Sequence, residues 1–218
     1  LEGDDPYDKY LPRISSVVSK IFVLYLSLTF ILFTLYYVNG MTVFDAIAHS
    51  FSTVSTGGFS THNESFAFFE SHTILIIAII FMILGSFPFL VIVQTNFKNL
   101  FVTLKDHQVR IFLLILIIAI TLVYFFAKDY VSGNTLEKVI VISFNTISII
   151  SGTGFTSENF ENWGNYASVL FLLLMFIGGC AGSTTGGLKI FRFQILFNHI
   201  SLHLKKMLKP HAVIVTRF

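Results

Sequence analysis

The sequence predicts an all-α protein that crosses a lipid bilayer several times. Three observations support this fold class: the composition, four apolar stretches and an internal repeat. Hydrophobic residues make up 54% of the 218 residues and charged residues only 12%, and the mean hydropathy is +0.78. Soluble domains hold roughly 25% charged residues. So little charge cannot cover a soluble core, which excludes disorder, nucleic-acid binding and an ordinary cytosolic enzyme.

Four stretches are expected to span the membrane, because a spanning helix needs about 20 mostly apolar residues. They comprise residues 17–38, 73–93, 111–127 and 166–204. Gly85 and Pro88 interrupt the second stretch. The Gly-rich run 178–187 breaks the fourth, after which apolar residues resume at Leu188. The sequence therefore predicts two continuous spans and two broken ones.

The positive charge is distributed unevenly and predicts the orientation of the chain. Of the 14 Lys and Arg residues, 12 lie in residues 1–20, 94–110 and 188–218. The two segments that join the spans on the other side carry more acidic than basic residues. The positive-inside rule therefore places both ends of the chain, a lead-in over 1–16 and a connector over 209–218, on the cytoplasmic side.

The two halves of the chain match at a constant offset of 96 residues. Identical residues at this offset include Ser52 and Ser148, Ser55 and Ser151, Gly58 and Gly154, Phe59 and Phe155, and Asn63 and Asn159. The sequence therefore predicts two copies of one unit, over 17–105 and 110–208. Each copy is built as a span, a short re-entrant helix, a Gly-containing stretch and a second span.

Each outer segment is expected to hold a short helix followed by an irregular stretch. The helices are expected over 42–54 and 135–150, and the Gly-containing stretches over 55–59 and 151–155. Irregular backbone is tolerated at membrane depth only where it is buried in protein or lines a watery path. One such loop is more commonly a simple turn. Two in register indicate a cation selectivity filter, in which extended backbone presents carbonyl oxygens to the ion.

Several motifs resemble the membrane subunit of Trk-type potassium uptake systems, in the Trk/Ktr/HKT superfamily. FDAIAHSFST at 44–53 with GGFSTH at 57–62 is similar to the second pore repeat of that family. FIGGCAGSTTGGLK at 176–189 is similar to the broken inner helix of the third repeat, and KPHAV at 209–213 to the connector before a fourth. The resemblance covers essentially the whole chain.

The resemblance implies four span–pore-helix–span repeats around one K+-selective pore, with backbone carbonyls lining the ion sites. The filter residues that it implies are Ser55, Thr56, Gly57, Gly58, Ser151, Gly152, Thr153 and Gly154. It also implies that the Gly-rich run is an intramembrane loop that gates conduction below the filter. The gate residues are Gly179, Gly182, Ser183, Thr184, Thr185, Gly186 and Gly187. A small-residue face for helix association is the alternative for this run.

The resemblance further implies a homodimer, a cytosolic nucleotide-binding regulatory subunit and a location in the bacterial plasma membrane. We expect no cofactor beside the transported K+ and no nucleic-acid partner. We also expect no enzymatic activity, because no spaced set of acid, base, nucleophile or metal ligands occurs. The family's pore needs four repeats and this chain holds two, so we expect the missing repeats in the same or another chain. An autonomous two-repeat channel subunit that dimerises and a non-conducting remnant stay open as alternatives.

Other residues receive more ordinary interpretations. The single cysteine, Cys180, excludes an internal disulfide framework. His49 and His62 lie near the expected filter mouth but make a poor metal site, so packing or solvent exposure is expected. Lys189 and Arg192 are expected to anchor their helix at the inner membrane interface by snorkelling.

Overall fold

The computed structural model describes residues 6–94 and 100–208 of the chain. Within these residues the chain is helical and has no strand, with one isolated parallel bridge between Ile177 and Leu188. The predicted all-α class is therefore confirmed. The connector 209–218 and the first five residues of the lead-in lie outside the described residues.

The first half contains a long helix, a short interior helix and a helix that is broken near its end. Its elements are α1 (Pro6–Val38), α2 (Val43–Val54), the 3-10 helix η1 (Ser65–Phe69), α3 (His72–Gly85) and α4 (Phe89–Gln94). The second half begins with a short connecting helix and then follows the same order. Its elements are α5 (Leu100–Lys105), α6 (His107–Ala127), α7 (Thr135–Ile150), η2 (Phe160–Trp163), α8 (Asn165–Leu174) and α9 (Ile190–Leu208).

Two of the described helices are long and apolar enough to cross a membrane. They are the Ser15–Val38 part of α1, with mean hydropathy 2.1, and α6, with 2.8. Two further apolar helices, α3 and α8, are shorter. Helix α3 ends where the sequence turns to Gly85 and Ser86, and α8 ends at Leu174, shortly before the Gly-rich run begins. These lengths suit a membrane protein in which two spans are continuous and two are interrupted.

Side-chain caps fix where the two short interior helices begin. At α2, Thr42 Oγ1 accepts a hydrogen bond from Asp45 N at 3.1 Å. At α7, Asn134 and Glu137 form a capping box: Asn134 Oδ1 accepts from Glu137 N, and Glu137 Oε2 accepts from Asn134 N, each at 3.0 Å. These bonds satisfy N–H groups that have no partner within the helix.

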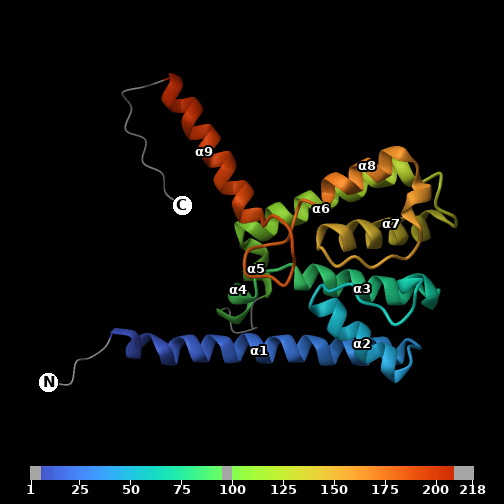
Figure 1. The fold of residues 1–218 in the computed structure, drawn as a ribbon, viewed down its shortest axis with the longest axis horizontal. Helices are drawn as coiled ribbons and strands as arrows, with labels where there is room; N and C mark the ends of the chain where they lie inside the picture. Colours follow the sequence, from blue (N-terminus) through green and yellow to red (C-terminus); the bar gives the residue numbers. More distant parts are fainter. Residues whose placement is uncertain (1–5, 95–99, 209–218) are drawn as a thin grey trace.

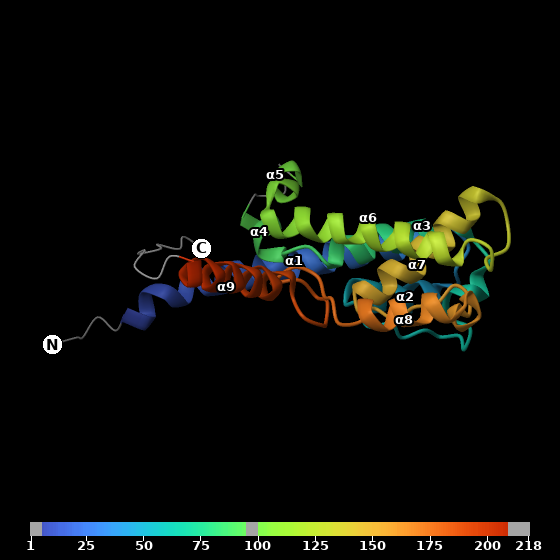
Figure 2. The ribbon, with the colours of Figure 1, turned by 90° about the horizontal axis from the view of Figure 1, so that it is seen from above.

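Helix α7 lies at the centre of the bundle, packed between α3 and α6 (Figure 1). From Val141 to Ile150, all residues except Ser143 are buried. The ring of Phe66 in η1 joins the two halves, because its centroid lies 4.5 Å from that of Phe155 and 5.2 Å from that of Phe144. Aromatic pairs at such separations stabilise packing beyond the area that they bury. In contrast, α9 extends away from α7 and α8 (Figures 1 and 2).

Candidate functional site

The first predicted filter segment, residues 55–59, turns sharply out of the C-terminus of α2. Ser55 N donates to Phe51 O at 3.0 Å, and Gly57 N donates to Ser52 O at 2.7 Å. Two of its residues have left-handed backbone, Thr56 with φ 51° and Gly58 with φ 74°. Left-handed backbone is uncommon for a β-branched residue such as Thr and natural for Gly. The chain therefore alternates in handedness along this segment.

The second predicted filter segment, residues 151–155, has the same backbone pattern after α7. Gly152 has φ 70° and Gly154 has φ 87°, and these two positions are 96 residues beyond Thr56 and Gly58. The offset found in the sequence thus recurs in the backbone conformation. Additional side-chain bonds hold this copy. Ser148 Oγ donates to Phe155 O at 2.8 Å, and the hydroxyls of Ser151 and Thr153 lie 2.7 Å apart.

The two predicted filter segments touch each other directly. A Cβ atom added to Gly58 would lie 1.8 Å from the carbonyl oxygen of Thr153, so this position has room only for Gly. The equivalent Gly154 has nothing within 4 Å of its added Cβ. Just beyond the contact, Phe66 N donates to Thr156 O at 3.0 Å and ties η1 to the end of the second segment.

The Gly-rich loop, residues 178–187, fills the break between α3 and α4. Cys180 N donates to Ser86 O at 3.0 Å, and Thr184 N donates to Gly85 O at 3.1 Å. In return, Phe89 N at the start of α4 donates to Gly182 O at 3.1 Å. Polar backbone groups need partners where water is excluded, and here the two broken helices supply them to each other.

The same loop lies against both predicted filter segments. Thr56 Oγ1 donates to Ser55 O at 2.7 Å and lies 3.5 Å from Thr184 Oγ1. In the other half, a Cβ added to Gly152 would lie 3.4 Å from Gly186 N. Gly85 is enclosed at the centre, since its added Cβ would lie 3.2 Å from Thr184 Oγ1 and 3.3 Å from Thr56 Cγ2. The end of α3, the first filter segment and the loop therefore meet at one point.

The remaining predicted site residues have local contacts. Ser55 and Gly57 contact their own segment, with Ser55 Oγ 3.1 Å from a Cβ added to Gly57. Within the loop, Gly179 N donates to Thr185 Oγ1 at 3.0 Å. Gly187 has left-handed backbone and is packed closely against the loop's first residue, Gly178.

Lys189 belongs to this site, although the sequence suggested only an interfacial anchor. Its Nζ points into the loop, 3.1 Å from Ser183 Oγ and 3.0 Å from Thr185 Oγ1. The anchoring interpretation of Lys189 is therefore wrong. No local pattern signals this contact, because a Lys at a helix start can extend toward water as readily as it can fold back.

The packing expected for His49 is confirmed, but the sequence did not reveal its hydrogen-bond partners. It is fully buried, with Nδ1 2.8 Å from Asp45 O and Nε2 2.9 Å from Ser60 Oγ. At the equivalent position of the second half, Asn145 Nδ2 donates to Ser157 Oγ at 2.7 Å. In both halves a polar side chain of the interior helix thus braces the chain just after the filter segment. The described residues contain no group of three or more His, Cys, Asp or Glu side chains placed to hold a metal.

Asp45, in the first turn of α2 and outside the spanning helices, anchors the same segment after the predicted filter. Its Oδ1 accepts from Thr61 Oγ1 at 2.6 Å and lies 3.3 Å from His62 Nε2, and its Oδ2 accepts from Thr42 Oγ1 at 2.7 Å. Burial raises the pKa of the Asp45 carboxyl. The hydrogen bonds from Thr61 and Thr42 and the nearby His62 ring outweigh that effect, so the pKa is held below its usual value. The His62 ring in turn stacks on the Phe68 ring, with the two ring centroids 3.6 Å apart.

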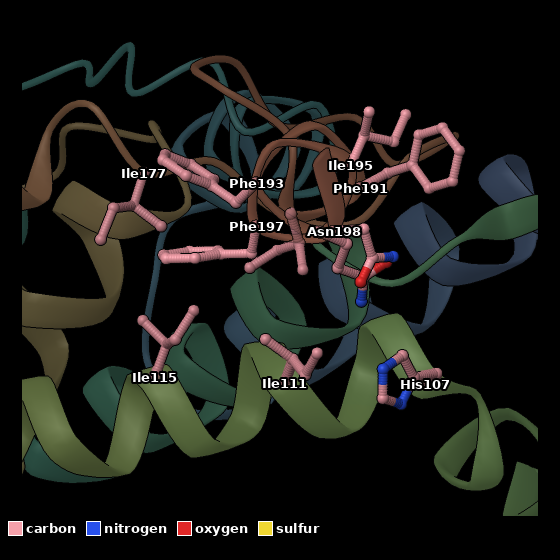
Figure 3. Close-up of a pocket in the computed structure, with 11 residues that line it drawn as sticks. His107, Ile111, Ile115, Ile177, Phe191, Phe193, Ile195, Phe197 and Asn198 are labelled. Atoms are coloured by element: carbon pink, nitrogen blue, oxygen red, sulfur yellow. The ribbon is translucent and has the colours of Figure 1, made fainter. Parts of the chain in front are cut away.

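A cavity of about 720 Å³ lies between α6 and α9, apart from the filter segments (Figure 3). Its walls are mostly apolar, with Ile111 and Ile115 of α6 facing Phe193 and Phe197 of α9. None of the predicted filter or gate residues lines it. We therefore assign it no part in the candidate site.

Two short interior helices end in matching left-handed turns, and a loop from a broken helix packs against both turns. Together with the two long apolar helices, this arrangement fits the class of polytopic membrane proteins. A sequence model of the TrkH family, described as a cation transport protein, matches residues 2–218. The chain belongs to this family. The predicted resemblance to Trk-type potassium uptake proteins is thereby confirmed.

Individual relatives agree with this family. The chain is 38% identical over 211 residues to the Trk system potassium uptake protein TrkH of Salmonella typhimurium. The match covers 94% of this chain and 43% of that protein. The chain is 32% identical over 220 residues to TrkI of Halomonas elongata, covering 100% of this chain and 44% of that protein. The crystal structure of the potassium transporter TrkH from Vibrio parahaemolyticus superposes with a TM-score of 0.84 at 33% identity, covering all of this chain and 46% of that one. The chain thus spans less than half the length of these relatives.

Proposed function

We propose that this chain supplies part of a K+ pathway across the bacterial plasma membrane, as a portion of a Trk-type K+ uptake protein. The observation that carries the proposal is the contact between the two filter segments at Gly58 and Thr153, in a chain whose relatives are potassium uptake proteins. The backbone carbonyls of 55–58 and 151–154 would replace the water of a passing ion. No cofactor beside the transported ion and no enzymatic step enters this proposal.

Two filter segments cannot surround an ion, and the structure has two open sides where further segments would fit. Phe59 is 80% exposed, whereas its equivalent Phe155 is 1% exposed because it packs against the first half. Gly154 is open where its equivalent Gly58 is covered. We propose that repeats of the same construction cover both sides, from the same chain or another one.

We propose that the Gly-rich loop gates this pathway. Its Thr184 and Gly186 lie beside Thr56 and Gly152, directly against both filter segments. A small-residue packing face would instead appear as a regular helix against a neighbouring helix, whereas here residues 178–187 form no helix. The irregular backbone and its position beside the filter segments favour a gate.

The proposal also includes the orientation of the chain in the membrane and its partner proteins. The charge distribution supports cytoplasmic ends for this segment. A homodimer and a cytosolic nucleotide-binding regulatory subunit are proposed from the family resemblance alone.

The test is Rb+ uptake into cells that lack their own K+ uptake systems. The cells express either a full-length protein that contains this chain or the chain by itself. Uptake with the full-length protein only is the expected result. Uptake with the chain alone would favour an autonomous dimerising subunit, and no uptake from either, with both proteins present in the membrane, would favour a non-conducting remnant.

A matched pair of glycine variants links uptake to the filter. Gly58→Ala places a methyl group against Thr153 O, whereas Gly40→Ala adds one in a left-handed turn with open space around it. We expect Gly58→Ala to abolish uptake and Gly40→Ala to retain most of it. Equal uptake by both variants would contradict the filter assignment.

A further inference from the structure

The ammonium group of Lys189 is enclosed by oxygen atoms of the Gly-rich loop. Beside the two hydroxyls already described, Nζ lies 3.5 Å from Ser183 O and donates to Thr185 O. Among the residues that the structure describes, no carboxylate forms an ion pair with it. Two carbonyls and two hydroxyls therefore compensate this charge, and these are the ligand types that hold a K+ ion in a filter.

The hydrogen bonds around Nζ form a complete network. Thr185 Oγ1 accepts from Gly179 N at 3.0 Å and from Lys189 Nζ, which uses both of its lone pairs. Its own proton must therefore go to Ser183 Oγ, 2.7 Å away. Ser183 Oγ in turn donates to Cys180 O at 2.7 Å. Removing the ammonium would leave this partly buried network without its central donor, and an incompletely satisfied network is costly where water is scarce.

This network fixes the loop residue that meets the first filter segment. Ser183 and Thr185 flank Thr184, whose N and Oγ1 both donate to Gly85 O, at 3.1 and 3.0 Å. Thr184 Oγ1 also lies 3.5 Å from Thr56 Oγ1. Because both neighbours of Thr184 are bound to one ammonium, its position beside the filter depends on Lys189.

We propose that Lys189 is a positioning residue that holds the Gly-rich loop against the filter segments, acting as a tethered cation inside a cage of loop oxygens. Withdrawal of the ammonium frees the loop and opens the path. The consequence for conduction rests on the proposed function, whereas the consequence for the order of the loop does not.

Cys180 is a native reporter of the loop, because it is the only cysteine in the sequence and is fully buried. The experiment compares wild type and Lys189→Met in the full-length protein, reconstituted in liposomes. A membrane-permeant maleimide labels the protein, and peptide mass follows Cys180. We expect labelling about 10-fold faster in Lys189→Met, the factor that corresponds to one lost charge-assisted hydrogen bond. We also expect Rb+ flux per molecule to rise several-fold, which a general loss of stability would not produce.

Two further variants separate the specific contact from loss of charge or of fold. Arg192→Gln removes a positive charge from an exposed side chain three residues further along α9 and should leave labelling and flux unchanged. Thr185→Val removes the central hydroxyl while keeping the shape, and should behave like Lys189→Met with little added effect in the double variant.

Each outcome bears on one proposal or the other. Labelling of Lys189→Met at the wild-type rate would overturn the role of Lys189, as would an equal effect of Arg192→Gln. Faster labelling without any Rb+ flux in wild type would leave the loop contact standing and overturn the proposed function.

Discussion

The two predicted filter segments have the same backbone pattern but different surroundings. Phe155 in the second segment is buried against Phe66, whereas the equivalent Phe59 is 80% exposed. Ser148 Oγ donates to Phe155 O, whereas the equivalent Ser52 Oγ is buried and has no hydrogen-bond partner among the described residues. In the second segment both the ring and the carbonyl of the Phe are thus held by protein, whereas in the first segment the Phe ring is exposed and the equivalent Ser hydroxyl is unpaired within the described residues.

The difference shows how a repeat of this kind is completed. The second segment rests on elements of the preceding half, namely η1 and the buried His49. Among the described residues, no equivalent of η1 lies before the first predicted filter segment. The second predicted filter segment is therefore shaped by its own interior helix and completed by the half before it.

The largest expected effect comes from the two glycines that match at the 96-residue offset, Gly58 and Gly154. In the full-length protein, we expect Gly154→Ala to abolish Rb+ uptake as completely as Gly58→Ala. The reason is that a carbonyl from a following unit would face Gly154 as Thr153 O faces Gly58. Expression and membrane insertion of each variant are measured beside uptake.

If Gly154→Ala reduces Rb+ uptake only slightly, this expectation is contradicted. Such a result would mean that nothing covers Gly154 and that only the strain of left-handed backbone is added, roughly 1–2 kcal/mol. Gly40→Ala serves as the reference for that strain alone.

The next effect concerns the two phenylalanines. Phe155→Ala should lower the stability of the full-length protein by about 3–5 kcal/mol, because it empties a filled site between the halves. We expect Phe59→Ala to cost a similar amount there if a preceding unit covers it. Thermal unfolding in detergent measures both, and a neutral Phe59→Ala would show that this ring faces lipid or water instead.

A smaller effect distinguishes the two serines. Ser148→Ala should cost about 1 kcal/mol, because Phe155 O loses its donor. Ser52→Ala should be nearly neutral in this chain, because its hydroxyl donates to nothing within the described residues. If Ser52→Ala proves as costly in the full-length protein, a neighbouring unit must bring the Phe59 carbonyl into reach, which chemical denaturation of both variants would reveal.

The smallest effect is a pH dependence confined to the first half. The pKa of Asp45 is lowered on folding, so its contribution to stability is present above the unfolded pKa of about 3.9 and is lost as pH falls through the folded value. The equivalent residue of the second half is Val141, which does not titrate. Asp45→Asn should lower the stability at neutral pH and reduce the loss of stability on going to acid pH. Thermal unfolding at pH 7 and pH 3 measures both effects. If the variant loses as much stability between pH 7 and pH 3 as the wild type does, the role of this carboxylate is contradicted.

Local signals made much of the fold predictable. Gly85 and Pro88 mark the break between α3 and α4, and the run 178–187 marks the break before α9. Even the capping box of Asn134 and Glu137 has a sequence signature three residues apart.

The contacts between these features were not predictable from the sequence. That Thr184 bonds Gly85, 99 residues away, follows from how the helices pack, and no periodicity encodes it. The same holds for Lys189, whose long side chain has several available directions, and for His49, whose partner Ser60 lies beyond the filter segment. The positions of the breaks are local properties, whereas their meeting is a property of the whole fold.

The exchange of hydrogen bonds between the two helix breaks has a consequence for any movement of the loop. If the loop leaves, the carbonyls of Gly85 and Ser86 and the N–H of Phe89 lose their partners together. Such groups stay unbonded only at a cost of several kcal/mol in an apolar medium. Water must therefore enter as the loop departs, so displacement of the loop and wetting of the passage are a single event.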